Sequence, residues 1–286
     1  MKPLGTLLSD SFSFFQKHFM VLLVGAVVFG LLNGWVGSYM DIQGKKFATN
    51  MMQDMGAGNM MNENNIQKMQ DLTMKAMQGD ADAAMELEKM GESMEAMAGE
   101  MEQKMRNMKM PTAETIGGFA GMLGKGMLLS MLISTLAAAY FLSVTVLNAT
   151  SVGGAVSLAG AHIVKVFLLS IWIMIRTFVW IPFVGIVTGI ILGPRFITAP
   201  INLLEGKKGV MESASMSYTQ TTGQWGKIFG NMIAVAIVLW IAVMIVAMVL
   251  GMFGTIGTWV TAILVQLGSA FMMVFGIHLA RTVMAK

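Results

Sequence analysis

Long apolar segments separated by short polar ones dominate this chain of 286 residues. A helix that spans a bilayer needs about 20 mostly apolar residues, and segments of this kind cover residues 18–40, 126–148, 227–251 and 257–280. A longer apolar segment, 163–204, has room for two spans, and Ile181–Pro182 lies near its middle. Proline removes a helical hydrogen-bond donor and disfavours helix at the residue before it, so we place a turn there. The pattern predicts an all-α bundle of six transmembrane helices.

Short amphipathic segments precede every second span. They are rich in small and hydroxyl side chains and cover residues 8–13, 152–162 and 210–221. The first belongs to a predicted helix at 3–16, which would lie in the headgroup zone with one apolar side made of Leu4, Leu7, Leu8, Phe12 and Phe15. Three parallel repeats of an interfacial helix and a transmembrane hairpin would produce this pattern. Any hydrophobic hairpin preceded by polar residues would produce it equally.

The composition agrees with a membrane protein. Only 12% of the residues are charged, whereas soluble domains have about 25%. The chain has no cysteine, which excludes disulfides, zinc–thiolate sites, iron–sulfur clusters and a cysteine nucleophile. The net charge of +3 is small and its cations are scattered, which does not suit a surface that follows nucleic-acid phosphates. We therefore expect the lipid bilayer as a partner, and no nucleic acid.

The basic residues orient the predicted spans. With six spans, both termini and the connections 149–162 and 205–226 fall on one side, which holds most of the Lys and Arg outside the loop 41–123. The positive-inside rule places that side in the cytoplasm. We expect a prokaryotic plasma (inner) membrane protein with four parts: a cytoplasmic interfacial helix at 1–17, a first span at 18–40, an extracytoplasmic helical hairpin at 41–123, and spans two to six within 124–286.

Methionine is concentrated in the predicted extracytoplasmic hairpin, because residues 51–110 hold 16 of the 32 methionines. A helix predicted at 82–109 would carry them as one narrow stripe at 100° per residue. The stripe consists of Leu87, Met90, Met94, Met97, Met101, Met105 and Met108. Pro111 would end this helix, and the apolar face of residues 64–77 predicts an antiparallel partner for it.

Three interpretations of the methionine stripe remain open. The first is ordinary packing, since methionine is a flexible filler of apolar cores. The second is an adaptable surface that binds a protein partner or a second copy of the chain. The third is Cu(I) or Ag(I) binding by thioethers. We rank metal last and assign neither a metal site nor a cofactor, because residues 41–123 contain no histidine or cysteine.

Two arginines lie within the predicted third and fourth spans, Arg176 and Arg195. A charge inside the membrane is costly and marks a functional site by default, although Arg176 would equally be explained by snorkelling to the outer interface. No acidic residue of the spans is available to pair with them, so a lipid headgroup or a substrate is the expected contact. In the fourth span, Gly185, Gly189 and Gly193 have the spacing of a close helix-packing ridge.

Catalytic patterns are lacking in the sequence. None of the histidines, His18, His162 and His278, has a carboxylate within helical reach. Ser269 lies nine residues before His278, about 14 Å along one helix, which is too far for a serine–histidine dyad. The predicted cytoplasmic segments have neither a Gly-rich phosphate loop nor paired carboxylates. We expect no catalytic residues and no enzyme.

A family resemblance is carried by the segment that follows the third span. Ile181–Pro182–Phe183–Val184–Gly185 precedes a set of spaced positions: Arg195, Pro200, Glu205–Gly206, Ala214, Ser217 and Trp225. This resembles the membrane domain associated with glycerophosphoryl diester phosphodiesterases, a broad family of six-span prokaryotic proteins. The resemblance covers roughly residues 163–281, and departs from the family where Phe183 replaces a glycine and in the methionine-rich loop. It implies architecture alone, since the chain has no His-Arg-Gly start of a fused catalytic domain.

These patterns predict a non-catalytic membrane scaffold or accessory subunit whose methionine-rich hairpin binds a protein partner or forms a homo-oligomer. The alternative is a transporter or lipid-handling protein that uses Arg176 and Arg195. Binding of Cu(I) or Ag(I) by the loop is a minor alternative.

Overall fold

The computed structural model describes residues 2–54, 113–178 and 188–285, with isolated positions between 72 and 89. Every regular element among these residues is helical, which confirms the all-α prediction. By its contacts the chain divides into two compact units. One combines Met1–Gly37 with Leu128–Lys286, and the other is Ser38–Met127.

Five helices in the described residues are long and apolar enough to cross a membrane. They are α2 (Phe19–Asp54), α5 (Ala113–Thr145), α6 (Val152–Phe178), α10 (Trp225–Gly251) and α11 (Gly254–Met284). These helices confirm the positions of the first, second, third, fifth and sixth predicted spans. Three of them extend well beyond those spans, because no proline interrupts the polar residues at 41–54, 113–125 and 152–162.

The predicted fourth span is not one continuous helix in the part of it that the structure describes. A short helical stretch at 188–192 leads into a 3₁₀ turn, η1 (Gly193–Phe196), and then into a short helix, α8 (Ala199–Leu204). Pro194 and Pro200 lie within the first two residues of η1 and α8. A proline tolerates the first turn of a helix but not its interior. The two prolines therefore divide what the apolar pattern predicted as a single span.

The three predicted interfacial helices have different outcomes. The first is α1 (Leu4–Lys17), and the third is α9 (Val210–Gln220), each a separate helix. The prediction of a separate second interfacial helix at 152–162 is wrong, because these residues form the first turns of α6 without a break. The expected repeat of an interfacial helix plus a hairpin therefore does not hold at its second member.

α1 packs against α11 through most of the predicted face, because Leu4, Leu7 and Leu8 join a core cluster with Phe275, and Phe12 alone of the predicted side is exposed. Leu7, Ser11 and Phe15 are buried, whereas Phe12, predicted on the apolar side, is 55% exposed. Residues four apart share a helix face, and Phe12 lies about 100° away from Ser11. The ring of Phe15 packs edge-on against Phe271 of α11, with centroids 5.6 Å apart. Contact with α11 thus selects the buried face.

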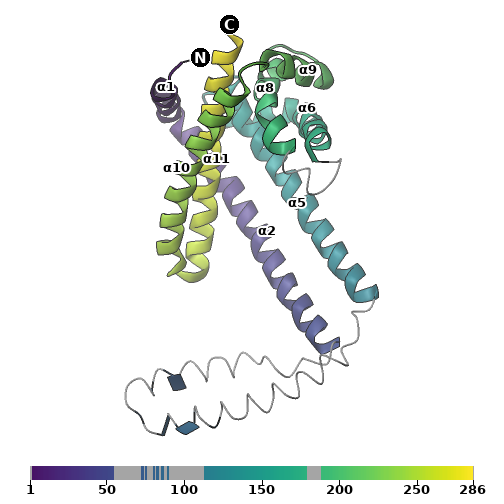
Figure 1. Ribbon diagram of the computed structural model, residues 1–286, viewed down its shortest axis with the longest axis vertical. Coiled ribbons are helices and arrows are strands. Elements are labelled where there is room, and N and C mark those ends of the chain that lie inside the picture. The colour runs from purple at the N-terminus through teal and green to yellow at the C-terminus, as the bar shows by residue number, and fades with distance from the viewer. Residues whose placement is uncertain are drawn as a thin grey trace. The chain divides into compact units, whose positions relative to one another are not determined.

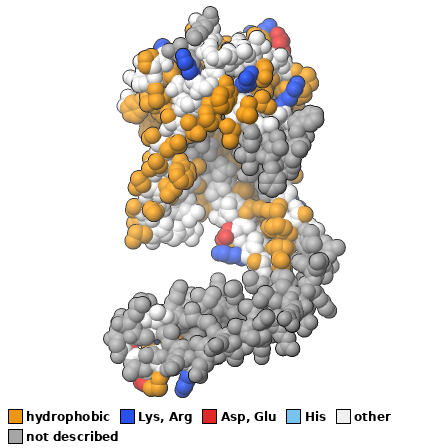
Figure 2. All heavy atoms as spheres, in the orientation of Figure 1, with side chains coloured by type: hydrophobic (Ala, Val, Ile, Leu, Met, Phe, Trp, Pro, Cys, Tyr) orange, Lys and Arg blue, Asp and Glu red, His pale blue; other side chains and the backbone are white. Residues whose placement is uncertain are grey.

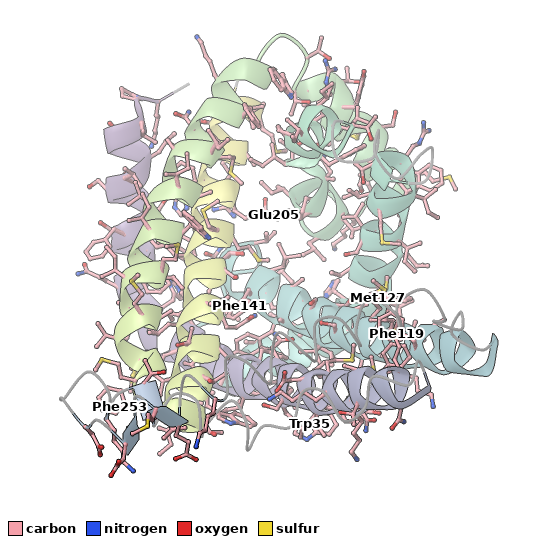
Figure 3. The ribbon with its side chains drawn as sticks, turned by 60° about the horizontal axis from the view of Figure 1, so that its bottom comes forward. Trp35, Phe119, Met127, Phe141, Glu205 and Phe253 are labelled. Carbon is pink, nitrogen blue, oxygen red and sulfur yellow. The ribbon has the colours of Figure 1, made fainter. Side chains whose placement is uncertain are left out.

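α10 and α11 form a hairpin, side by side along their length (Figure 1). Phe253 lies in its turn, between the segments predicted as the fifth and sixth spans (Figure 3). Gly254 begins α11 with a φ of +59°, and a Cβ on Gly257 would collide with the carbonyl oxygen of Leu250. Glycine has no Cβ and adopts positive φ at little cost. These two glycines allow the tight return of the chain.

α2 approaches α11 through glycines that the sequence interpretation passed over. A Cβ on Gly30 would lie 2.6 Å from the Cα of Ile263, and one on Gly34 would lie 3.3 Å from the ring of Trp259. Gly30 and Gly34 form a small-xxx-small pair, which lets helix backbones approach closely in a membrane. Gly193 of the predicted ridge has open space around it. Gly185 lies outside the described residues, and Gly189 belongs to the short stretch before η1.

Polar contacts reinforce the packing of α2. The hydroxyl of Tyr140 on α5 donates a hydrogen bond of 2.8 Å to the carbonyl oxygen of Val21. The Nδ2 of Asn33 donates one of 3.4 Å to the Oε1 of Gln266 on α11. Phe141 is buried beside Tyr140 in the core between these helices (Figure 3). Side chains that bond across helices add to association where apolar contact alone gives little preference for protein over lipid.

The second unit contains the end of α2 and the start of α5. The rings of Phe47 and Phe119 stack with centroids 4.4 Å apart, and a Cβ on Gly126 would collide with the sulfur of Met40. The two helices therefore pack closely beyond residue 38. The predicted methionine stripe lies outside the described residues; its members are Leu87, Met90, Met94, Met97, Met101, Met105 and Met108.

We predict that Gly30→Ala lowers the free energy of unfolding, by about 1–3 kcal/mol, because the new methyl group overpacks the contact with Ile263. Thermal unfolding in mild detergent measures this. Gly37→Ala is the matched control on the same helix, since nothing lies within 4 Å of its Cβ position. It should be neutral or slightly stabilising. Equal destabilisation by both variants would contradict the close approach of α2 and α11.

Candidate functional site

A cavity of about 570 Å³ lies between α6, η1 and α9. Trp172 and Arg176 of α6 line one side, and Leu192 and Phe196 line another. The remaining wall is α9, with Met211, Ala214, Ser215, Tyr218 and Thr219. Small-molecule sites have volumes of about 300–1,000 Å³. None of the described side chains that line this cavity is acidic, so Arg176 makes its potential positive.

Arg176 lines this cavity, so its side chain is not isolated at the end of the predicted third span. Its guanidinium carbon lies 5.2 Å from the centroid of the Trp172 ring, one helical turn earlier. One of the two interpretations left open for Arg176, snorkelling to the outer interface, would separate it from the segment 210–221, which the sequence places on the cytoplasmic side. Arg176 and α9 line one cavity instead, because the segment broken by Pro194 and Pro200 brings α8 and α9 alongside α6.

Arg195 reaches the other aromatic side chain of the cavity. Its guanidinium carbon lies 4.5 Å from the centroid of the Tyr218 ring, within range of a cation–π interaction. Its Nε is buried and has no hydrogen-bond partner among the described residues. The structure thus connects both arginines to one cavity, Arg176 as a lining residue and Arg195 through Tyr218.

Hydrogen bonds from α9 hold the broken segment in place. The Oγ of Ser217 donates to the carbonyl oxygen of Arg195 at 2.7 Å and lies 3.1 Å from the backbone nitrogen of Thr198, whose N–H it accepts. The hydroxyl of Thr221 lies 3.2 Å from the same carbonyl oxygen and shares its proton with the carbonyl oxygen of Ser217, at 2.8 Å. Ser217, Thr198 and Thr221 are fully buried. Buried backbone groups need partners, and here side chains one turn apart on α9 supply them.

Gln220 extends this network toward α8. Its Oε1 accepts hydrogen bonds from the hydroxyl of Thr198, at 2.7 Å, and from the Nδ2 of Asn202, at 3.1 Å. At the end of α8, Glu205 receives a charge-assisted hydrogen bond of 2.6 Å from Arg281 of α11 (Figure 3). α8 is therefore fixed at both ends, by α9 and by α11, and its Ala199 and Leu203 pack with Phe196, which lines the cavity.

Exposed ion pairs lie on α1 and at the start of α9. Lys2 donates to Asp10 at 2.7 Å on α1, and the hydrogen bond lowers the pKa of Asp10. Lys208 donates to Glu212 at 2.9 Å at the start of α9 and likewise lowers the pKa of Glu212. Both carboxylates are exposed, so these pairs contribute little to stability. The Lys208 pair neutralises the acidic group of α9, and neither pair lines the cavity.

The histidines take part in packing. His18 stacks on Phe14 with ring centroids 4.2 Å apart, and His278 meets the same ring edge-on at 5.5 Å. The Nδ1 of His162 lies 2.9 Å from the carbonyl oxygen of Leu158. Within the described ranges, no group of three or more His, Asp or Glu side chains is placed to hold a metal ion.

Sequence reasoning found the two arginines but missed the polar face of α9. Ser213, Ser217 and Thr221 follow each other at intervals of four residues, and all three are fully buried. A hydroxyl row at helical spacing, next to a segment containing two prolines, is the signal that predicts this contact. Trp172 and Tyr218 gave no such signal, because only the fold brings them to one cavity.

No family model, curated protein or solved structure matches this chain. The resemblance to the membrane domain of glycerophosphoryl diester phosphodiesterases therefore stays a prediction from residues 163–281. The function is argued from the geometry of the site.

We predict that Ser217→Ala destabilises the protein by about 1–3 kcal/mol, because the Arg195 carbonyl oxygen and the Thr198 N–H lose a buried partner. Ser213→Ala is the matched control on the same helix. Ser213 is equally buried, and its Oγ has no partner in the described residues. That variant should be neutral or stabilising, as read from thermal unfolding. An equal loss of stability in Ser217→Ala and Ser213→Ala would contradict the assigned role of Ser217.

Proposed function

We propose that this chain is a non-catalytic, lipid-handling membrane protein that binds the acidic headgroup of a membrane lipid between α6 and α9. One observation carries the proposal: Arg176 lines a cavity of ligand size whose described lining has no carboxylate. Arg176 lies in the last turn of α6 and is exposed to this cavity, and a guanidinium at membrane depth needs an anion to compensate it. Membrane lipids are the anions that surround such a protein.

The chemistry of the lining suits a phosphate-bearing headgroup. The planar guanidinium of Arg176 matches two phosphate oxygens at once. Ser215 and Thr219 lie one turn apart on the opposite wall, where Ser215 supplies a hydroxyl donor and the hydroxyl of Thr219 donates to the Ser215 carbonyl oxygen. Trp172 and Tyr218 add the amphipathic rings that favour the boundary between acyl chains and headgroups. Cation, hydroxyls and interfacial aromatics together favour an acidic headgroup over a neutral apolar ligand.

The position of the cavity also supports the proposal. In the first unit the two chain termini lie at one end, beside α8 and α9 (Figure 1). Lys and Arg side chains gather at this end on the visible face, whereas apolar side chains cover α10 and α11 farther along (Figure 2). Exposed residues of α10 such as Trp240, Ile245 and Met248 suit contact with lipid tails. We propose that the basic end lies at the cytoplasmic surface of a prokaryotic plasma membrane.

We predict that Arg176→Gln lowers affinity for phosphatidylglycerol by about ten- to a hundredfold, since hydrogen bonds to a charged group contribute about 1.5–3 kcal/mol. Native mass spectrometry of the purified protein, with phosphatidylcholine as the neutral competitor, measures this. Lys165→Gln is the charge-matched control, because Lys165 is exposed on α6 away from the cavity. Soluble glycerol phosphate should bind more weakly than the lipid, since equal affinity would indicate a site for free phosphate. Equal binding of phosphatidylglycerol by the wild-type protein, Arg176→Gln and Lys165→Gln would contradict the proposal.

A second candidate function is the scaffold predicted from the methionine-rich segment. The observation that favours it is the length of the helices at its ends. α2 has 36 residues and α5 has 33, and a bilayer core requires about 20. The stack of Phe47 on Phe119 pairs the two helices next to this segment. A paired helical stalk of this kind would present the methionine stripe to a protein partner or to a second copy.

We predict that replacing residues 55–112 with a short Gly-Ser linker abolishes self-association of the chain. The stalk helices end at Asp54 and begin at Ala113, so the linker leaves them intact. Mass measurement in mild detergent follows the oligomeric state. Substituting Met85, which is exposed and outside the stripe, is the control. A full-length chain that is already monomeric would contradict self-association through this segment.

A further inference from the structure

A second cavity, of about 370 Å³, lies next to the first and has a different character. Its lining is almost entirely apolar and comes from α5, α6, α10, α11 and the segment between η1 and α8. Residues of α11 from Ser269 to Ile277 form one wall, and Pro200 with Ile197 form another. The cavity is an apolar groove between these helices that is open on one side, where acyl chains would surround it in a membrane.

Phe196 lines both cavities. It is 9% exposed and packs with Leu169 of α6 and Leu203 of α8. On α6, Trp172 and Arg176 face the first cavity, whereas Val166, Leu169, Ser170 and Ile173 face the second. At 100° per residue these two faces are adjacent, roughly 90° apart. One ring of Phe196 and one edge of α6 therefore separate a cationic cavity from an apolar one.

We propose that the two cavities form one bipartite site for an anionic phospholipid, with the headgroup at Arg176 and an acyl chain in the apolar cavity. Phe196 is the residue that sets how far the chain enters. This inference rests on the proposed headgroup site and adds the tail and its selectivity. The occupant follows from charge complementarity: a cationic cavity and an apolar cavity that share one side chain match the two ends of an acidic amphiphile.

Gly276 offers a way to fill the apolar cavity without touching the headgroup site. It lines the second cavity from α11, and its Cβ position meets only the end of Met232, at 3.9 Å. Gly276→Leu would therefore occupy the space for the chain and leave Arg176 and Trp172 in place. Gly268→Leu, two turns earlier on α11 with nothing within 4 Å, is the matched control.

The test measures the affinity of the full chain for lysophosphatidylglycerols of increasing chain length. In the wild-type protein each added methylene should raise affinity by about fourfold until the cavity is full, from about 0.8 kcal/mol per buried methylene. Gly276→Leu should remove this dependence while preference for phosphatidylglycerol over phosphatidylcholine persists. Gly268→Leu should behave as wild type. Phe196→Ala, which removes the ring that separates the two cavities, should move the plateau to longer chains.

The outcomes separate this inference from the proposed function. If acidic lipids bind in an Arg176-dependent way, but chain length has the same effect in wild type, Gly276→Leu and Phe196→Ala, the bipartite site is wrong and the headgroup site stands. If Arg176→Gln leaves the binding of acidic lipids unchanged, both are wrong. A plateau that moves with Phe196 and Gly276, together with charge selectivity that depends on Arg176, supports both.

Discussion

The hydrogen bonds between α9 and the backbone around Arg195 are the constraint on which the site depends. In an apolar environment, irregular backbone is tolerated only where protein groups or enclosed water satisfy it. Pro194 and Pro200 break the chain at this point, and Ser217 and Thr221 of α9 satisfy the carbonyl oxygen that the break leaves without a helical partner. Without α9 the segment would have to become a regular helix or leave the bundle. With α9 it stays buried and turns Phe196 toward α6.

This arrangement explains why a cavity exists here. A continuous helix would pack along α6 by ordinary ridges and grooves, whereas a 3₁₀ turn followed by a short helix leaves space beside it. The space is lined on one side by Arg176 and on the other by α9. Hydrogen bonds from Arg281 to Glu205 and from Asn202 to Gln220 hold α8 in place behind Phe196. A preformed cavity binds its ligand without the cost of ordering its walls.

The sequence predicted the regular part of the fold well. The α10–α11 hairpin follows from two apolar segments separated by a short turn at Phe253, and the structure places that turn there. α1 was predicted as a helix with most of its buried face, since Leu4, Leu7, Leu8 and Phe15 are buried or half-buried. Phe12 is exposed and Ser11 is buried instead, because periodicity alone does not say where the edge of the contact with a neighbouring helix lies. The two arginines were identified as site residues from the cost of charge in a membrane, and their aromatic partners were not.

Apolar length, proline positions and charge determined from the sequence alone that this chain is a helical membrane protein, where most of its long helices lie, and which arginines are exceptional. These properties are local, since each depends on a run of residues and on the solvent around it. Only the tertiary structure decided that the fourth apolar segment is broken, that Gly30 and Gly34 form the close helix contact, and that Arg176 meets α9. Each of these outcomes joins residues far apart in the chain. The physical reason is that a buried carbonyl oxygen must have a hydrogen-bond donor, and a glycine surface allows another helix to approach. Which donor and which helix take these places depends on how the whole bundle packs.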